Sequence, residues 1–307
     1  MQKIHGLIAA PFTPFDKRGQ LNKTIIPTYA AYLKKNGVRG VFVNGTTGEC
    51  ASLSREERML AAEMWVEVKD PQFKVFVQVG HDSLPEVQQL ARHAEEIGSD
   101  GIGVLPPIYF KPKDVTSLVA YNIEIARMVP RLPYFYYHIP RMTGVNFPMI
   151  DFLREAEKDI PNLAGIKYSH QDFMDMKLCL EYENQKYNVL PGIDEILICG
   201  LAMGVTGAIG STYNYINPLF LKIIESFNNG NLKIAQELQF EVIKIVQVLI
   251  KYGGGAEAGK AFMRLVGLDF GHPRLPTIRL SDFDESQLKS DLNAVGFLEH
   301  SRHIKTI

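Results

Sequence analysis

The sequence predicts a (β/α)8 barrel followed by a helical extension, and three observations predict it. Eight short apolar runs, rich in β-branched and aromatic residues, recur over the first two thirds of the 307-residue chain. Segments with the 3.6-residue periodicity and the start signals of helices lie between them. After residue 209 helical patterns alone follow. Strand–helix repetition favours a parallel sheet, and eight such units close as a barrel of about 250 residues.

The expected strands are continuous apolar runs, as parallel strands buried on both faces require. We place them at residues 7–10, 41–44, 75–79, 101–105, 134–139, 163–168, 189–190 and 205–209. Ser54 and Glu57 form the sequence pattern of a capping box at one helix start, and other helices are expected to begin near Ser83 and Asp114. The alternative, a doubly wound open sheet, lacks its dinucleotide fingerprint, because residues 11–14 read Pro-Phe-Thr-Pro where the glycine loop would be.

Helical patterns at 218–228, 233–251, 257–266 and 285–294 follow the last strand. We expect the first to be the last barrel helix and the others to form a C-terminal helical domain. The predicted organisation is therefore a barrel with the active site at 1–230 and a helical domain packed on it at 231–307. No low-complexity linker separates the two, so we expect one rigid body.

Composition limits the class of protein. Lys and Arg number 33 against 34 Asp and Glu, a net charge of −1, so bulk charge attracts neither nucleic acid nor an anionic membrane. Hydrophobic residues are 46% and charged residues 22%, as in ordinary globular proteins. We find neither an apolar run of about 18 residues nor a signal peptide, so we expect a cytoplasmic protein. Cys50, Cys179 and Cys199 are scattered, which predicts free thiols and neither disulfide nor zinc site.

Reacting groups of such a barrel lie at the carboxyl ends of the strands. Lys167 is next to last in the sixth run, and period-two geometry places 163, 165, 167 and 169 on one face. If that face is the lumen, Gly165 leaves room beneath the amine, and low dielectric favours its neutral, nucleophilic form. Such an amine attacks a ketone to form a Schiff base. The alternative is a lysine that extends from the strand end to a carboxylate at the rim.

Two further strand ends carry polar groups. Tyr137 faces the lumen if Phe135 and Ile139 do, and its hydroxyl could then move a proton beside Lys167; the alternative is a packing tyrosine. Residues 45–49 read Gly-Thr-Thr-Gly-Glu, whose backbone N–H groups can form a nest for a carboxylate. The alternative there is a simple strand-to-helix turn.

The segment 254–261 nearly spells a nucleotide-binding loop. Ala261 stands where magnesium would need Ser or Thr, and a helical pattern precedes it, so its glycines are expected to break one helix and start the next. His138, His170 and His272 are isolated in the sequence, so no metal site is expected.

In combination, these motifs resemble the family of pyruvate-dependent class I aldolases that includes dihydrodipicolinate synthase and N-acetylneuraminate lyase. G-T-T-G-E at 45–49, Y-H-I-P at 137–140, G-I-K at 165–167 and G-x-D-E at 192–195 stand in family order and spacing. The resemblance covers nearly the whole chain, from His5 to about Leu298. It implies a barrel with a C-terminal helical domain, assembled as a homotetramer of two tight dimers, and no metal or organic cofactor.

The same resemblance implies roles for single residues. Lys167 corresponds to the Schiff-base lysine, Tyr137 to the proton-transfer tyrosine, and Thr46 with Thr47 to the pair that receives the substrate carboxylate. Tyr109 lies where relatives place a tyrosine that reaches the partner subunit's site.

The branch is indicated by the residues around the site. Met142 stands where the synthase branch has an arginine for its aldehyde substrate, and Arg141 lies one residue earlier. Ile193 occupies a place where some lyases carry an aromatic residue. The lyase branch implies reversible cleavage of N-acetylneuraminate to N-acetylmannosamine and pyruvate. The substrate-binding residues it shares are Ser169, Gly192, Asp194, Glu195 and Ser211.

Three alternatives stay open. The chain could be another pyruvate aldolase, making dihydrodipicolinate or cleaving shorter 2-keto-3-deoxy sugar acids. It could bind a keto acid without turnover, or use residues 254–260 as a nucleotide switch.

Overall fold

The computed structural model describes residues 3–301, and its centre is a ring of eight parallel strands. The strands are β1 Gly6–Ala9, β2 Gly40–Val43, β3 Lys74–Gln78, β4 Gly101–Val104, β5 Tyr134–His138, β6 Leu163–Tyr168, β7 Asn188–Pro191 and β8 Gly207–Gly210. Hydrogen-bonded ladders join them in the order β7-β6-β5-β4-β3-β2-β1-β8, and β7 lies against β8. The predicted (β/α)8 barrel is confirmed.

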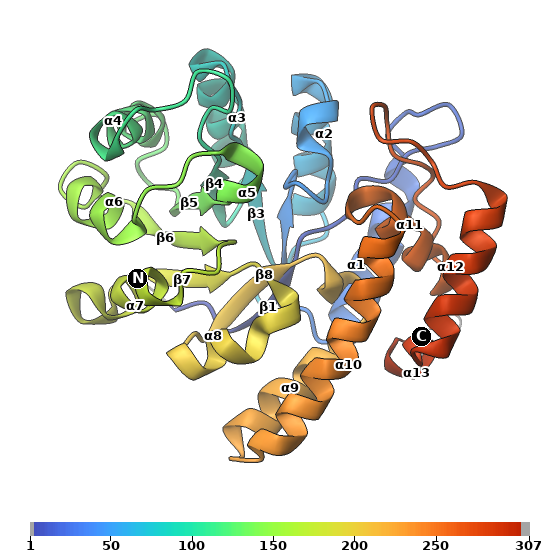
Figure 1. The fold of residues 1–307 in the computed structure, drawn as a ribbon. Coiled ribbons are helices and arrows are strands. Elements are labelled where there is room, and N and C mark those ends of the chain that lie inside the picture. Colours follow the sequence, from blue (N-terminus) through green and yellow to red (C-terminus); the bar gives the residue numbers. More distant parts are fainter. Residues whose placement is uncertain (1–2, 302–307) are drawn as a thin grey trace.

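Helices alternate with the strands and cover the outside of the ring (Figure 1). The barrel helices are α1 Ile26–Lys35, α2 Arg55–Val66, α3 Leu84–Glu96, α4 Val115–Ala126, α5 Pro140–Thr143, α6 Met149–Ala156, α7 Phe173–Gln185, α8 Leu197–Met203 and α9 Asn217–Asn228. The Ser54 and Glu57 capping box is formed, and a second one begins α4 at Asp114. α3 begins directly after Ser83, as expected, without a side-chain cap from it.

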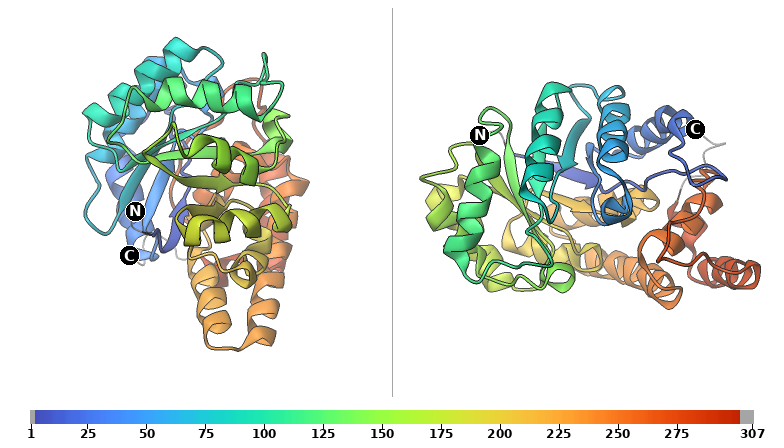
Figure 2. Two further views of the ribbon diagram at one scale, coloured as in Figure 1. Left: turned by 90° about the vertical axis from the view of Figure 1, so that its left-hand side faces the viewer. Right: turned by 90° about the horizontal axis from the view of Figure 1, so that it is seen from above.

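The C-terminal helices gather on one side of the barrel, in orange and red in Figures 1 and 2. They are α10 Leu232–Lys251, α11 Gly255–Leu265, α12 Asp282–Ala294 and α13 Phe297–His300. α10 packs against α9, and the buried Gln239 on α10 accepts from the Ile198 N–H and donates to the Asp194 carbonyl. Residues 1–2 and 302–307, the ends of the two expected domains, lie outside the described residues.

Two apolar layers form the core. The larger one lies between strands and helices, and the smaller one fills the lumen. Phe42 and Tyr137 meet edge to face there with ring centroids 5.5 Å apart, as do Phe76 and Phe135 at 5.6 Å. Such perpendicular pairs suit the quadrupoles of aromatic rings. The lumen is therefore a packed floor beneath the strand ends.

One predicted face of the sixth strand was wrong. Leu163 packs toward the helices, and Ala164 instead lies in the lumen. A β-bulge is the reason: Tyr134 pairs with Leu163 while the next residue, Phe135, pairs with Gly165, so the inward and outward alternation shifts within β6.

Gly165 also differs from its expected role of leaving room for the amine. Its φ is +155°, and a Cβ there would collide with the carbonyl oxygen of Asn188 on β7. The glycine therefore permits the close approach of β6 and β7, and the bulge places Lys167 on the lumen side.

Candidate active site

Lys167 lies at the carboxyl end of β6 with its amine over the aromatic floor of the lumen. The residue is 3% exposed. Its Nζ is 4.0 Å from the ring centroid of Tyr137 and 4.4 Å from that of Phe42. No carboxylate of residues 3–301 lies within ion-pair distance of this amine, so the rim-carboxylate alternative finds no support in the structure. An amine among aromatic faces, at a strand end, has the surroundings that covalent chemistry with a carbonyl needs.

Tyr137 lies directly beside Lys167 across the β5–β6 ladder. Phe135 and Ile139 share its lumen face, as predicted, and Tyr134 and Tyr136 point to the helices. The Tyr137 hydroxyl lies 3.4 Å from the Thr46 Oγ1, so two strand ends meet at one hydroxyl pair. Tyr137 is thus both a packing residue and a polar group aimed at the mouth of the barrel.

The Gly45–Glu49 turn follows β2 and presents Thr46, which is exposed, and Thr47, which is half-buried. Asn44, which precedes the turn, and Glu49, its last residue, both have left-handed backbone with φ 56°. A non-glycine residue in this region is uncommon and needs support from its surroundings.

Asp194 lies in the turn after β7 and is 4% exposed. Its Oδ2 accepts from the Thr212 N–H at 2.9 Å and from the Thr212 hydroxyl at 2.6 Å. Its Oδ1 has no hydrogen-bond partner among residues 3–301. Burial raises the pKa of this carboxyl, and the bonds from Thr212 and the charge of Lys167 oppose the increase. Thr212, next to the predicted Ser211, was missed by the sequence analysis.

The other predicted substrate-binding residues also lie after strand ends. Ser169 follows β6, and its Oγ packs against Gly192, which follows β7. Burial raises the pKa of the Glu195 carboxyl, and the Arg141 charge acts against this. Ser211 follows β8 and is half-buried. The structure thus brings all predicted strand-end residues to one end of the barrel.

A buried polar network beneath the turn after β2 was not predicted. Arg58 on α2, 2% exposed, donates to the Gln78 carbonyl, the Gln78 side chain and the Gly80 carbonyl. Gln78 in turn lies 3.5 Å from the Cys50 sulfur, and burial raises the pKa of that thiol. A charged residue on the apolar face of a helix, among Ala61, Ala62 and Trp65, was the available signal.

Tyr109 lies in the loop between β4 and α4. It is 79% exposed and packs edge to face on Phe110, which is 83% exposed, with Ile108 beside them. The Asp82 carboxylate accepts the backbone N–H groups of Ile108 and Tyr109 and fixes the loop. The loop therefore presents two large apolar rings on the surface of the chain.

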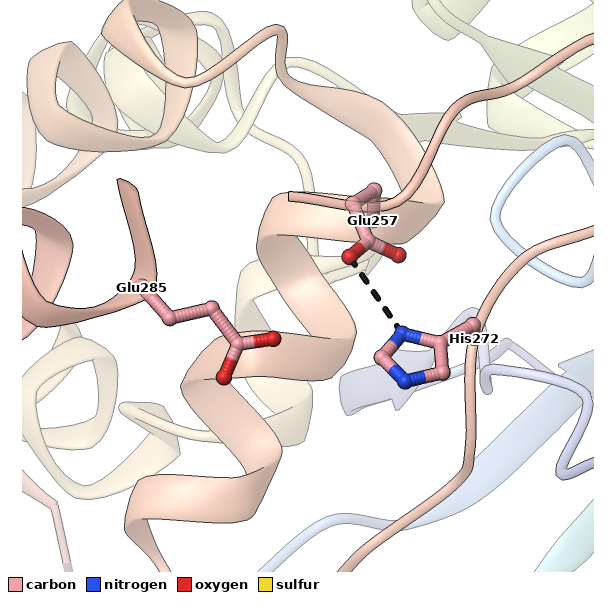
Figure 3. A group of neighbouring side chains, drawn as sticks. All are labelled: Glu257, His272 and Glu285. Atoms are coloured by element: carbon pink, nitrogen blue, oxygen red, sulfur yellow. Dashed lines mark ion pairs between the residues drawn. The ribbon is translucent and has the colours of Figure 1, made fainter. Parts of the chain in front are cut away.

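The sequence position of His272 suggested an isolated residue, but in the structure it has charged neighbours. It lies beside Glu257 and Glu285, with its Nδ1 3.6 Å from a Glu257 oxygen (Figure 3). Arg264 brings positive charge to both carboxylates, because its Nη2 is 2.5 Å from Glu285 and 4.0 Å from Glu257. The arginine satisfies the charge that a metal ion would otherwise balance, so we assign this cluster to ion pairing.

The glycine-rich segment before this cluster behaves as predicted. α10 ends at Lys251, Gly254 precedes α11, and both helices belong to the same helical region. Lys260 is 0% exposed and bonded within the protein, so no phosphate-binding loop is formed. In the part of the chain described, no helix is long and apolar enough to cross a membrane.

Comparison with known proteins agrees with this arrangement. A sequence model of the dihydrodipicolinate synthetase family matches residues 3–295. The chain belongs to this family. The family resemblance that the motifs predicted is therefore confirmed.

Similar proteins within this family carry the name of one enzyme, N-acetylneuraminate lyase. N-acetylneuraminate lyase of Rattus norvegicus is 39% identical, over 97% of this chain and 94% of the rat protein. The enzyme of that name from Homo sapiens is 41% identical, over 94% of this chain and 93% of the human protein. The structure of Proteus mirabilis N-acetylneuraminate lyase superposes with a TM-score of 0.93 at 40% identity, covering 97% of this chain and 100% of the other.

Proposed function

We propose that this protein is a Schiff-base aldolase that cleaves N-acetylneuraminate reversibly to N-acetylmannosamine and pyruvate. The observation that carries the proposal is the buried Lys167 amine, 4.0 Å from the Tyr137 ring at the carboxyl ends of adjacent strands. Relatives that bear the lyase name and match nearly the full chain support the choice of substrate.

Lys167 is the nucleophile of the reaction. Its nitrogen adds to the C2 ketone of the open-chain sugar acid and forms a carbinolamine. The Tyr137 hydroxyl, near Lys167, gives its proton to the departing hydroxide, so water leaves and a cationic iminium remains beside a phenolate. The lysine thereby provides the electron sink that cleavage needs.

Bond cleavage uses the phenolate as base. Tyr137 takes the proton of the C4 hydroxyl, C4 becomes the aldehyde carbon of N-acetylmannosamine, and the C3–C4 electron pair moves into the iminium to give an enamine. Tyr137 then returns the proton to C3. Water hydrolyses the resulting iminium, which releases pyruvate and restores the amine. Every step is reversible, so the reaction runs in both directions.

The remaining predicted residues bind the substrate in this proposal. Thr46 and Thr47, with the backbone N–H groups of their turn, receive the carboxylate next to C2. Hydroxyl, carboxylate and backbone groups along the mouth suit the polyhydroxylated chain of a sugar acid. These groups are contributed by Ser169, Gly192, Asp194, Glu195 and Ser211.

The proposal also covers the oligomeric state, the domain division and the cellular location of the protein. The exposed rings of Tyr109 and Phe110 support a homotetramer built from two tight dimers, with Tyr109 placed toward the partner subunit. We divide the chain into a barrel at 1–230 and a helical domain at 231–307. The three free cysteines support a reducing, cytoplasmic location.

The decisive experiment is reduction with borohydride in the presence of pyruvate, followed by mass mapping of the modified residue. We expect the reduced pyruvate adduct on Lys167, and none when pyruvate or borohydride is omitted. An adduct on another lysine, or none, would overturn the mechanism.

Substrate choice needs a separate assay. With pyruvate as donor, we expect N-acetylmannosamine to be the preferred acceptor over aspartate semialdehyde and glyceraldehyde. Preference for aspartate semialdehyde would replace the lyase with a synthase on the same Schiff-base chemistry, and preference for glyceraldehyde with a 2-keto-3-deoxy sugar acid aldolase.

A further inference from the structure

A buried ion pair ties the turn that carries Thr46 and Thr47 to the C-terminal helices. Glu49, the last residue of the turn, has its Oε1 2.7 Å from the Lys260 Nζ on α11. The side chains are 6% and 0% exposed. Removing two charges from water is unfavourable unless both are well paired, so this contact needs a structural or functional reason.

The turn depends on such contacts because its backbone is strained at both ends. At the first end, the Asn44 side chain donates to the Arg58 carbonyl. At the second end, Glu49 accepts from the Arg274 N–H through Oε2 and contacts Lys260 through Oε1. Each left-handed residue is therefore held by its own side chain.

Lys260 is itself held on several sides. Its Nζ lies 4.3 Å from the Phe15 ring centroid and 3.4 Å from the His272 carbonyl oxygen. Glu257, which precedes it by one helical turn and is drawn with His272 in Figure 3, adds negative charge nearby. Burial lowers the pKa of Lys260, and the charges of Glu49 and Glu257 oppose the decrease.

The position of Glu49 affects the backbone conformation of the whole turn. The Glu49 N–H donates to the Thr46 carbonyl at 3.0 Å, so the position of Glu49 sets the path of the intervening residues. The carboxylate nest consists of the backbone N–H groups along that path. A turn free to relax out of the left-handed conformation would rotate those groups away from a shared target.

We propose that Lys260 is a positioning residue which, through Glu49, holds the Gly45–Glu49 turn in the shape that binds the carboxylate of the keto acid. The inference rests on the proposed function. It assigns the lysine of the glycine-rich segment at 254–260 to the active site of the barrel, 211 positions away from Glu49 in sequence.

The test compares two ketones that differ in the carboxylate. Pyruvate and acetone offer the same reacting carbonyl, and only pyruvate uses the nest. The measured quantity is the ketone concentration that gives half-maximal borohydride trapping on Lys167, for wild type, K260M, K260R and E49Q. R264M is the matched control, because Arg264 forms an ion pair from the same helix without contacting the turn.

For K260M we expect the half-maximal pyruvate concentration to rise about tenfold or more, with little change for acetone. This is the scale of one weakened charge-assisted hydrogen bond between a backbone N–H of the turn and the carboxylate of pyruvate. K260R should recover most of the loss, and R264M should match wild type. E49Q provides the same comparison if K260M does not fold, since the amide keeps an acceptor for the Arg274 N–H and loses the charge that attracts Lys260.

Two outcomes would overturn the inference. One is a wild-type pyruvate value in folded K260M or E49Q, and the other is an equal loss for pyruvate and acetone, which indicates general loosening. Both leave the proposed function intact. A wild-type protein that pyruvate does not modify at Lys167 would instead overturn the proposed function, and the inference with it.

Discussion

We expect His138 to make the stability of this protein depend on pH, and the burial of its ring gives the size of the effect. Its ring is 1% exposed and lies among the rings of Tyr136, Tyr168 and His170. Neither ring nitrogen has a hydrogen-bond partner among residues 3–301. Burial, assisted by the charge of His170 and opposed by that of Asp172, lowers the pKa of His138 to about 3.

The sign follows from where the protons bind. In the unfolded chain the histidine binds a proton below its ordinary pKa of 6.5, whereas the folded protein keeps the ring neutral until about pH 3. The unfolded state therefore holds more protons in that window, and stability falls as the pH falls through it. For one such group the free energy of unfolding decreases by about 2 kcal/mol between pH 7 and pH 5.

The perturbation is His138→Asn, which replaces the imidazole with a group that does not titrate. Urea unfolding at pH 7 and pH 5 gives the free energy of unfolding of wild type and variant. We expect wild type to lose about 2 kcal/mol more than H138N over this interval, because the other titrating groups contribute alike to both proteins. Equal losses would refute the assignment of a neutral, buried ring to His138.

Three further changes test the site and the barrel. Lys167→Met should abolish pyruvate trapping and cleavage while far-UV circular dichroism stays that of a barrel; residual trapping would place the Schiff base elsewhere. Tyr137→Phe should lower kcat about 10²- to 10⁴-fold and leave pyruvate trapping detectable, as expected for loss of a proton-transfer group; an unchanged kcat contradicts its role. Gly165→Ala should lower the free energy of unfolding by about 3 kcal/mol because the added Cβ meets the Asn188 carbonyl. Gly230→Ala, where φ is also positive but the space is open, should lower it less. Urea unfolding measures both values, and equal losses would show that β6 tolerates the methyl group.

The barrel could be predicted because its strands are buried on both faces. Continuous apolar runs mark such strands without knowledge of their neighbours, and the eight observed strands lie within about two residues of the expected starts. The face of Leu163 could not be predicted in this way. A bulge depends on how β5 and β7 approach Gly165, and the alternation rule alone does not contain that information.

The candidate site was predictable where it lies at strand ends. Lys167 and Tyr137 follow from the rule that parallel strands expose their last residues at one end of a barrel. Thr212, Arg58 and Gln78 were missed because each supports another polar residue from a separate element. Their partners are defined only when the chain is folded.

Lys260 shows the same limit most clearly. Its glycine-rich surroundings match a nucleotide-binding pattern, and excluding that pattern from sequence left the lysine without a role. A lysine with no exposed surface must be paired within the protein, but the sequence does not identify its partner. In the folded protein the partner is Glu49, in the turn that carries Thr46 and Thr47. A charged residue on the buried face of a helix is therefore a reason to search for its partner at the candidate active site, even when its local motif has been excluded.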